Sequence, residues 1–226
     1  TVKLLDFDEW IKLAGEGDGA TSYMVNGMDV KIVAMDVFGR RIHDLAVAAT
    51  TVDGAVQITA AARELEGSGT WRPHGKGRLT ARLKRLVVPA AETRLTEVRD
   101  RPAAAAKPPE LPALDIVADT FQLGQKQLGR LELNAVHENR DWRIERLRIT
   151  NPDSTLVAEG LWQGWLTQPR TQMNVRFDVS DIGKTLARWG YPEGVRRGTA
   201  KIEGTLHWTG SPQEFDYPTL GGNLVI

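Results

Sequence analysis

The sequence has no cysteine among its 226 residues, so it can form neither a disulfide nor a thiolate metal site. This absence is compatible with either the cytosol or the periplasm. No apolar run approaches the roughly 18 residues that a membrane-spanning helix needs, and no signal-peptide pattern opens the chain. Because the chain opens on Thr1 and closes on Ile226 within a predicted strand, we expect a segment of a longer protein, with any membrane anchor elsewhere.

The sequence also lacks an excess of charge of either sign. It carries 29 Lys and Arg against 29 Asp and Glu, which gives a net charge of zero. A broad phosphate-binding surface requires an excess of cations, so we expect no nucleic-acid partner. The hydrophobic content of 41% is slightly low for a compact globule.

No constellation of catalytic or metal-binding residues is present. Ser154 and Ser180 lack a nucleophile-elbow context, and the GEGDG stretch at 15–19 follows a predicted helix instead of opening one. The histidines are scattered, without a His, Asp or Glu at helical ligand spacing: His43, His74, His137 and His207. We therefore expect a protein that is not an enzyme and that holds no metal or cofactor.

What the chain does contain is alternation of apolar and polar residues, most clearly over residues 114–165. Leu131, Leu133 and Ala135 share one parity, while the polar residues between them share the other. A period of two predicts strands of a sheet with one apolar face and one polar, solvent-exposed face. Similar alternation covers 172–179, 198–208 and the start of a strand at 220–226.

The same pattern occurs earlier in weaker form, over residues 31–71. Residues 32–34, the turn at 38–39 and the strand at 45–49 match residues 116–118, 123–124 and 131–135. The spacing drifts, so turn lengths vary between the two copies. A repeated one-sided unit predicts stacked modules that share one continuous apolar face.

Turns, bulges and short helices are predicted where this alternation is interrupted. Asp53-Gly54 predicts a tight hairpin turn. The Gly-containing stretch 66–69 predicts a bulge or bend, and a slip of apolar parity within 142–149 predicts a bulge near Glu145-Arg146. Short helices are predicted at 9–14 and 181–189, with Asp8 and Ser180 or Asp181 as candidate caps.

One composition break divides the chain. Residues 100–112 are rich in proline and alanine, which predicts an exposed linker or a surface loop. We accordingly expect a first β-repeat segment at 1–99 and a second at 113–226. The linker could separate two domains, but an insertion between adjacent strands of one sheet is preferred, because the sheet pattern resumes at once.

The predicted fold is mainly β: a curled antiparallel sheet of repeated units with two short helices. The apolar face could be covered by a second sheet in a sandwich, enclosed in a barrel, or left open as a trough that holds a hydrophobic ligand. Glycines within the alternation favour strong bending: Gly67, Gly69, Gly160 and Gly204. We interpret three tryptophans first as packing residues that close the core at the ends of the strands: Trp71, Trp162 and Trp208. The alternatives are contact with an acyl chain and contact with a sugar.

Four passages resemble the AsmA-like proteins, most closely the YhdP group: LPALD at 111–115, DWRIERL at 141–147, NPD at 151–153 leading to EGLW at 159–162, and LARWGYP at 186–192. The last is followed by GTLHW at 204–208 and by Pro212, Phe215 and Leu220, as in that group. The resemblance covers about 110–226 well and 1–100 thinly. Its motifs consist of packing and turn residues.

This resemblance implies a bridge-like lipid-transfer protein of the Gram-negative envelope, a periplasmic rod with an apolar groove, anchored in the inner membrane by a helix that this chain lacks. Its partners would be phospholipid acyl chains moving between the inner and outer membranes, together with other envelope proteins. The expected groove-lining residues are Leu131, Leu133, Leu156, Val175, Phe177, Ile202 and Leu206. The alternatives are a structural or adaptor β-sandwich and a carbohydrate-binding module.

Overall fold

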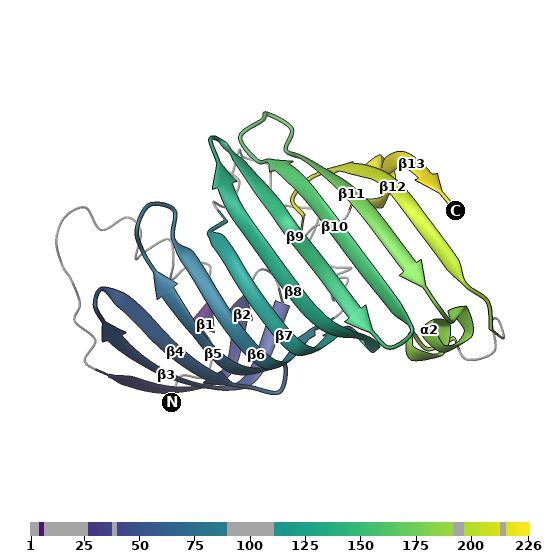
Figure 1. Ribbon diagram of the computed structural model, residues 1–226. Coiled ribbons are helices and arrows are strands. Elements are labelled where there is room, and N and C mark those ends of the chain that lie inside the picture. Colours follow the sequence, from purple (N-terminus) through teal and green to yellow (C-terminus); the bar gives the residue numbers. More distant parts are fainter. Residues whose placement is uncertain (1–4, 7–26, 38–39, 90–110, 192–196, 213–215) are drawn as a thin grey trace, which may run out of the picture.

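A computed structural model describes residues 5–6, 27–37, 40–89, 111–191, 197–212 and 216–226, and all its strands belong to one sheet (Figure 1). The strands are β1 (Leu5–Asp6), β2 (Met28–Val37), β3 (Arg40–Val52), β4 (Ala55–Ala61), β5 (Leu65–Arg72), β6 (Arg78–Val88), β7 (Ala113–Leu123), β8 (Lys126–Glu138), β9 (Asp141–Asn151), β10 (Ser154–Gln163), β11 (Arg170–Val179), β12 (Ala200–Thr209) and β13 (Gly221–Val225). They lie in the sheet in chain order, with β1 and β13 at its two edges. The prediction of a mainly β protein with an open sheet is confirmed.

The sheet is mixed, whereas the sequence predicted an antiparallel one. β6 pairs with β7 in parallel, as β1 does with β2, and the other neighbours are antiparallel. A parallel pair requires the chain to return to the end of the sheet at which the first strand began, so it cannot be joined by a hairpin. β6 and β7 flank the proline-rich stretch, and the direction of the chain beyond such a stretch is not encoded in its composition.

The two sequence repeats occupy corresponding strands. Ile32 on β2 is paired with Leu45 on β3, and Ala118 on β7 is paired with Leu131 on β8. The Trp-terminated passages of the two copies fall on β5 and β10. The order of strands within each copy is therefore the same.

The predicted turn and bulges are present. Val52 pairs with Ala55 across the Asp53-Gly54 turn. Glu145 is the extra residue of β9, because the register slips there against both β8 and β10. The bulge or bend predicted at 66–69 corresponds to an irregularity between Glu66 and Gly67, where β6 has the extra residue. Bulges increase the local twist and bend of a strand, so they contribute to the curl of the sheet.

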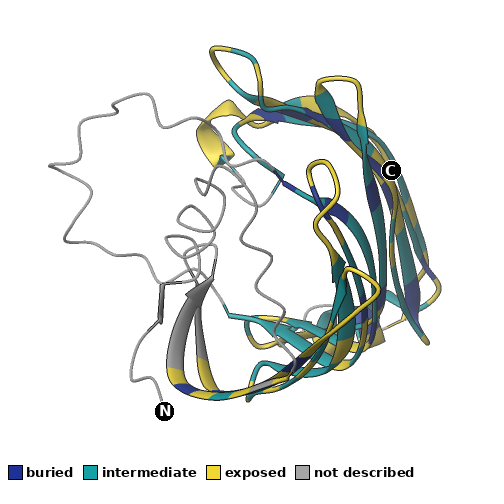
Figure 2. Cartoon of the chain, turned by 90° about the vertical axis from the view of Figure 1, so that its left-hand side faces the viewer, coloured by how far each residue is buried: buried dark blue, intermediate teal, exposed yellow. Residues whose placement is uncertain are grey.

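Close approach of neighbouring strands explains the glycines inside the alternation. A Cβ on Gly160 of β10 would lie 2.5 Å from the carbonyl oxygen of Gln172 on β11. The added atom would likewise meet backbone of the next strand at Gly67, Gly69 and Gly204. Viewed from the β3 side, the sheet follows an open arc (Figure 2).

One α-helix, α2 (Ile182–Arg188), and one 3-10 turn, η1 (Tyr217–Thr219), occur in the described ranges. The helix prediction at 181–189 is confirmed, and Asp181 is its N-cap, accepting a hydrogen bond from the backbone N–H of Lys184 at 3.0 Å. The other helix prediction, at 9–14, lies outside the described residues.

Candidate functional site

The register of the sheet places apolar residues in rows that run across the strands, because paired residues point to the same face. One row contains Val30, Val47, Ala60, Gly67, Leu83, Ala118, Leu131, Ile149, Leu156, Phe177 and Ile202. The next contains Ala49, Ile58, Gly69, Ala81, Ile116, Leu133, Leu147, Ala158, Val175, Gly204 and Leu224. The third contains Thr51, Val56, Trp71, Leu79, Leu114, Ala135, Ile144, Gly160, Met173, Leu206 and Gly222. We call these three rows the apolar face.

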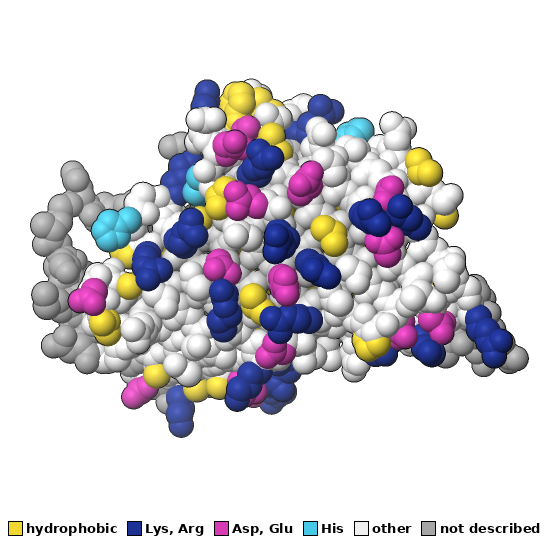
Figure 3. Space-filling model, viewed as in Figure 1, with side chains coloured by type: hydrophobic (Ala, Val, Ile, Leu, Met, Phe, Trp, Pro, Cys, Tyr) yellow, Lys and Arg dark blue, Asp and Glu magenta, His cyan; other side chains and the backbone are white. Residues whose placement is uncertain are grey.

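The apolar face contains no charged side chain, whereas the other face is rich in them. Figure 3 views that other face, which is the convex one, and shows acidic and basic side chains interspersed over it. Many form cross-strand ion pairs, including Arg82 with Asp115 at 2.9 Å and Arg176 with Glu203 at 3.3 Å. The apolar rows therefore line the concave side of the arc.

The two arginines with raised pKa values, Arg176 and Arg143, lie on the charged convex face. Hydrogen bonding to Asp178, reinforced by the negative charges of Asp178 and Glu203, raises the pKa of Arg176 above its ordinary value. Similarly, Glu138 raises the pKa of Arg143. These groups belong to the convex face, and the apolar face has no group whose ionisation could hold or move a proton.

Much of the apolar face is only half-buried. Leu133 on β8, Val175 on β11 and Ile202 on β12 keep part of their surface exposed, although none of the three lies on an edge strand. The described residues form one sheet and provide no second sheet to pack against these side chains. The sandwich alternative required such a second layer, so the described part of the chain does not support it.

Tryptophans close one end of the strands on this face. Trp142, Trp162 and Trp208 are each 5% exposed and belong to one buried cluster with Leu111. Trp142 Nε1 donates to the Pro112 carbonyl at 2.8 Å, and Trp208 Nε1 donates to the Ser211 carbonyl at 3.0 Å. This burial confirms core closure for Trp162 and Trp208 and removes their rings from any sugar-stacking surface.

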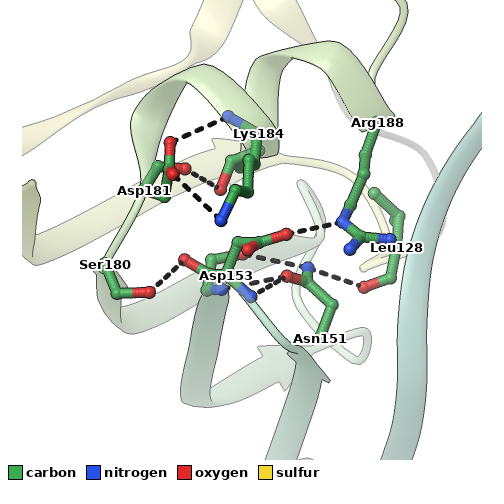
Figure 4. Close-up of polar contacts among 9 residues, drawn as sticks. Leu128, Asn151, Asp153, Ser180, Asp181, Lys184 and Arg188 are labelled. Carbon is green, nitrogen blue, oxygen red and sulfur yellow. Dashed lines mark hydrogen bonds and ion pairs between the residues drawn. The ribbon is translucent and has the colours of Figure 1, made fainter. Parts of the chain in front are cut away.

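A polar network and α2 occupy the opposite end of β8 to β11 (Figure 4). The buried Asp153 accepts a hydrogen bond from Arg188 Nε at 2.8 Å, and its backbone carbonyl accepts from the Ser180 backbone N–H at 2.9 Å. Trp189, just after the helix, stacks on Phe177 with ring centroids 5.8 Å apart. Since Phe177 lies in the first row, this contact places the end of α2 against the apolar face.

The convex face carries polar depressions. Two open, polar depressions of about 310 and 390 Å³ occur near the β8–β9 turn, and both are lined by Glu138, Arg143 and Glu159. These charged side chains belong to the convex face. No group of acidic or histidine side chains in the described ranges could hold a metal ion.

The seven residues predicted to line a groove all lie on the apolar face. Leu131, Leu156, Phe177 and Ile202 belong to the first row, Leu133 and Val175 to the second, and Leu206 to the third. The prediction omitted Leu147 and Ile149 of β9, because the bulge there interrupts the alternation. It also omitted the N-terminal contributors Ile58, Leu79 and Leu83, where alternation with small residues weakens the pattern.

Comparison with known proteins identifies the family. A family model described as YhdP protein matches residues 1–226. The chain belongs to the YhdP family. Neither curated proteins nor solved structures give a match. This membership confirms the resemblance seen in the sequence, and it makes the chain part of an AsmA/YhdP-like envelope protein. Within the described residues no helix is long and apolar enough to cross a bilayer.

Proposed function

We propose that this chain is a segment of a periplasmic YhdP-family protein whose apolar face carries phospholipid acyl chains between the inner and outer membranes. The observation that supports this proposal is the concave, uncharged and half-exposed face that crosses the sheet from β2 to β13. Covering apolar surface is worth about 25 cal/mol per Å², so acyl chains would be held there without specific polar contacts.

The dimensions suit an elongated ligand. The three rows lie about 7 Å apart along each strand, and neighbouring strands are about 4.8 Å apart, so the face is a strip much longer than it is wide. A strip of this shape accommodates extended chains that run across the strands. The buried tryptophans at one end of the strands and α2 at the other would keep the acyl chains between them.

The proposal includes a role without catalysis and an inner-membrane anchor for the full-length protein. The uncharged lining supports the first point, because general acid–base or nucleophilic catalysis requires titratable or nucleophilic side chains at the site. The anchor is what the resemblance to the YhdP group implies. Contacts with other envelope proteins are part of the same proposal.

Photo-crosslinking in the full-length protein tests the proposal. A photoreactive amino acid would replace Leu133, Val175 or Ile202 on the apolar face, and matched positions on the convex face would be Val157 and Thr205. We expect phospholipid adducts from the first set and none from the second. Equal yields from both faces, or no lipid adduct at any position, would refute the proposal.

A further inference from the structure

The concave apolar surface extends beyond the first row in the middle of the sheet. Leu65 lies on β5 two residues before the first row, so it points to the concave side. It is paired with Leu86 on β6, and Leu86 is paired with Phe121 on β7. Two residues farther along these strands, Val88 is paired with Leu123. Because paired residues share a face, these five side chains carry the apolar surface to the ends of β6 and β7, and we call them the apolar branch.

Other residues at the same level of the sheet are polar or buried. On the β9–β10 side, Asn151 Nδ2 donates to Oγ of the buried Ser154 at 2.9 Å. On the β2–β3 side, Ile32 is paired with Leu45, and the two are 6% and 2% exposed. By contrast, Leu123 is 43% exposed, and the other four residues of the apolar branch are half-buried. Apolar surface therefore stays accessible at the strand ends along the branch.

A cation lies where the apolar branch ends. Lys126 opens β8 and is paired with Leu123, so it belongs to the concave side. Its Nζ lies 5.8 Å from the centroid of the Tyr191 ring, just after α2. Both residues are exposed, and Lys126 forms no ion pair within the described ranges. The Gly124 backbone N–H donates to the Val88 carbonyl at 2.8 Å, which fixes the turn that carries this lysine.

We propose that phospholipid enters the apolar face sideways through the apolar branch, with its acyl chains on the branch and its phosphate at Lys126. This inference rests on the proposed function and adds an entrance to it. A lysine lays its stem along apolar surface and keeps its ammonium in water, and a ring with a polar tip, such as that of Tyr191, suits the same boundary. A head group whose acyl chains are covered lies at such a boundary. Along β7 the branch joins the first row at Ala118, so the acyl chains would meet no charged side chain on the way.

The first test asks whether the branch is an entrance. In the full-length protein, a photoreactive amino acid at Leu133 reports lipid on the second row. Leu123→Glu places a carboxylate on the branch, and the control Gln122→Glu adds the same charge to the neighbouring residue, which points to the convex face. We expect Leu123→Glu to lower the yield of phospholipid adduct at Leu133 by about tenfold, because acyl chains would have to dehydrate the carboxylate. The control should leave the yield unchanged.

The second test asks whether Lys126 contacts the phosphate. Native mass spectrometry of the chain would compare phosphatidylglycerol with diacylglycerol, which has the same acyl chains and no phosphate. Lys126→Gln should lower the preference for phosphatidylglycerol by about fivefold, the contribution of one cation near an anionic lipid. Lys201→Gln, which removes a cation from the convex face, should keep the preference. Inorganic phosphate at millimolar concentration should compete weakly, because it gains nothing from the branch.

The outcomes separate the entrance from the proposed function. An unchanged adduct yield in Leu123→Glu, or an equal loss in Gln122→Glu, would refute the entrance and leave the trough standing. An unchanged preference in Lys126→Gln, or a preference that inorganic phosphate abolishes, would refute the contact with the head group. The absence of any lipid adduct at Leu133 in the otherwise unsubstituted protein would instead refute the proposed function. Should Leu123→Glu lower the urea midpoint of the chain, the uncharged Leu123→Gln repeats the comparison.

Discussion

Placing a carboxylate on the apolar face should be costly, whereas the same carboxylate on the convex face should not be. Leu133 of β8 is paired with Ile116 and Leu147 in the second row. Val157 of β10 is paired with Arg148 and Arg176 on the other face. The substitutions Leu133→Glu and Val157→Glu therefore introduce the same group into opposite surroundings.

The magnitudes follow from these neighbours. Full burial of a leucine side chain is worth about 1.5–3 kcal/mol, so losing the half-buried Leu133 side chain costs about 1 kcal/mol. Partial dehydration of the new carboxylate adds about 1–3 kcal/mol, which gives a loss of about 2–4 kcal/mol for Leu133→Glu. At Val157 the new carboxylate faces two guanidinium groups, and each such cross-strand pair contributes about 0.2–1 kcal/mol, so stability should be unchanged or slightly higher.

Urea unfolding, followed by the fluorescence of the seven tryptophans, measures both free energies of unfolding. The slopes of the transitions must agree for the comparison to hold, since a changed slope signals a changed native or unfolded state. Equal losses of stability in the two variants would refute the assignment of the faces. A stable Leu133→Glu variant would mean that this side chain has no apolar surroundings.

Three further predictions concern the shape of the sheet and α2. Gly160→Ala should lower the free energy of unfolding by about 1–3 kcal/mol, because the added methyl group meets the backbone of β11; an unchanged urea midpoint would contradict this close approach. Deleting Glu145 removes the extra residue of β9 and keeps Ile144 and Leu147 on one face, so a folded but less curved sheet is expected; an identical small-angle scattering profile would show that the bulge does not set the curvature. The pKa of Asp181 is lowered from its ordinary 3.8, chiefly by the hydrogen bond from the Lys184 backbone N–H. A carboxylate with a depressed pKa contributes stability above its ordinary pKa, and this contribution is lost as the pH falls through the lower, folded value. The near-ultraviolet circular dichroism of the Phe177–Trp189 stack should therefore fall below about pH 4 in the unsubstituted chain, with a smaller change in Asp181→Asn; identical acid transitions would exclude Asp181 as the cause.

The faces of the strands could be predicted from the sequence because side-chain direction alternates with every residue. This is why seven residues chosen from four strands and from widely separated positions fall on one face. The bulge at Glu145-Arg146 was predictable for the same reason: Ile144 and Leu147 cannot share a face in a regular strand. The glycines pointed correctly to a bent sheet, since a glycine inside a strand often marks a bulge, a bend or the close approach of another backbone.

The direction of β7 and the packing of Leu111 depend on long-range contacts, which cannot be predicted from local sequence patterns. The parallel pairing of β6 with β7 is decided by where the chain re-enters the sheet, and residues 100–112 contain no signal for it. Leu111 falls at the end of that proline-rich stretch, yet it is only 3% exposed because it packs on the tryptophan cluster. The packing of Gly77 on the ring of Trp71 was likewise hidden, because the sequence shows a glycine turn at 74–77 but not the side chain that it meets.

The accessibility of the concave rows is the most direct test of the account, and the cysteine-free sequence makes it simple. Single cysteines would be introduced at Leu133, Val175 and Ile202, and maleimide labelling rates would be measured in the folded chain with and without phospholipid. We predict labelling without lipid and strong protection with it, while a cysteine at Val157 reacts equally in both conditions. Concave cysteines that remain unreactive in the lipid-free folded chain would show a sealed interior and contradict the trough.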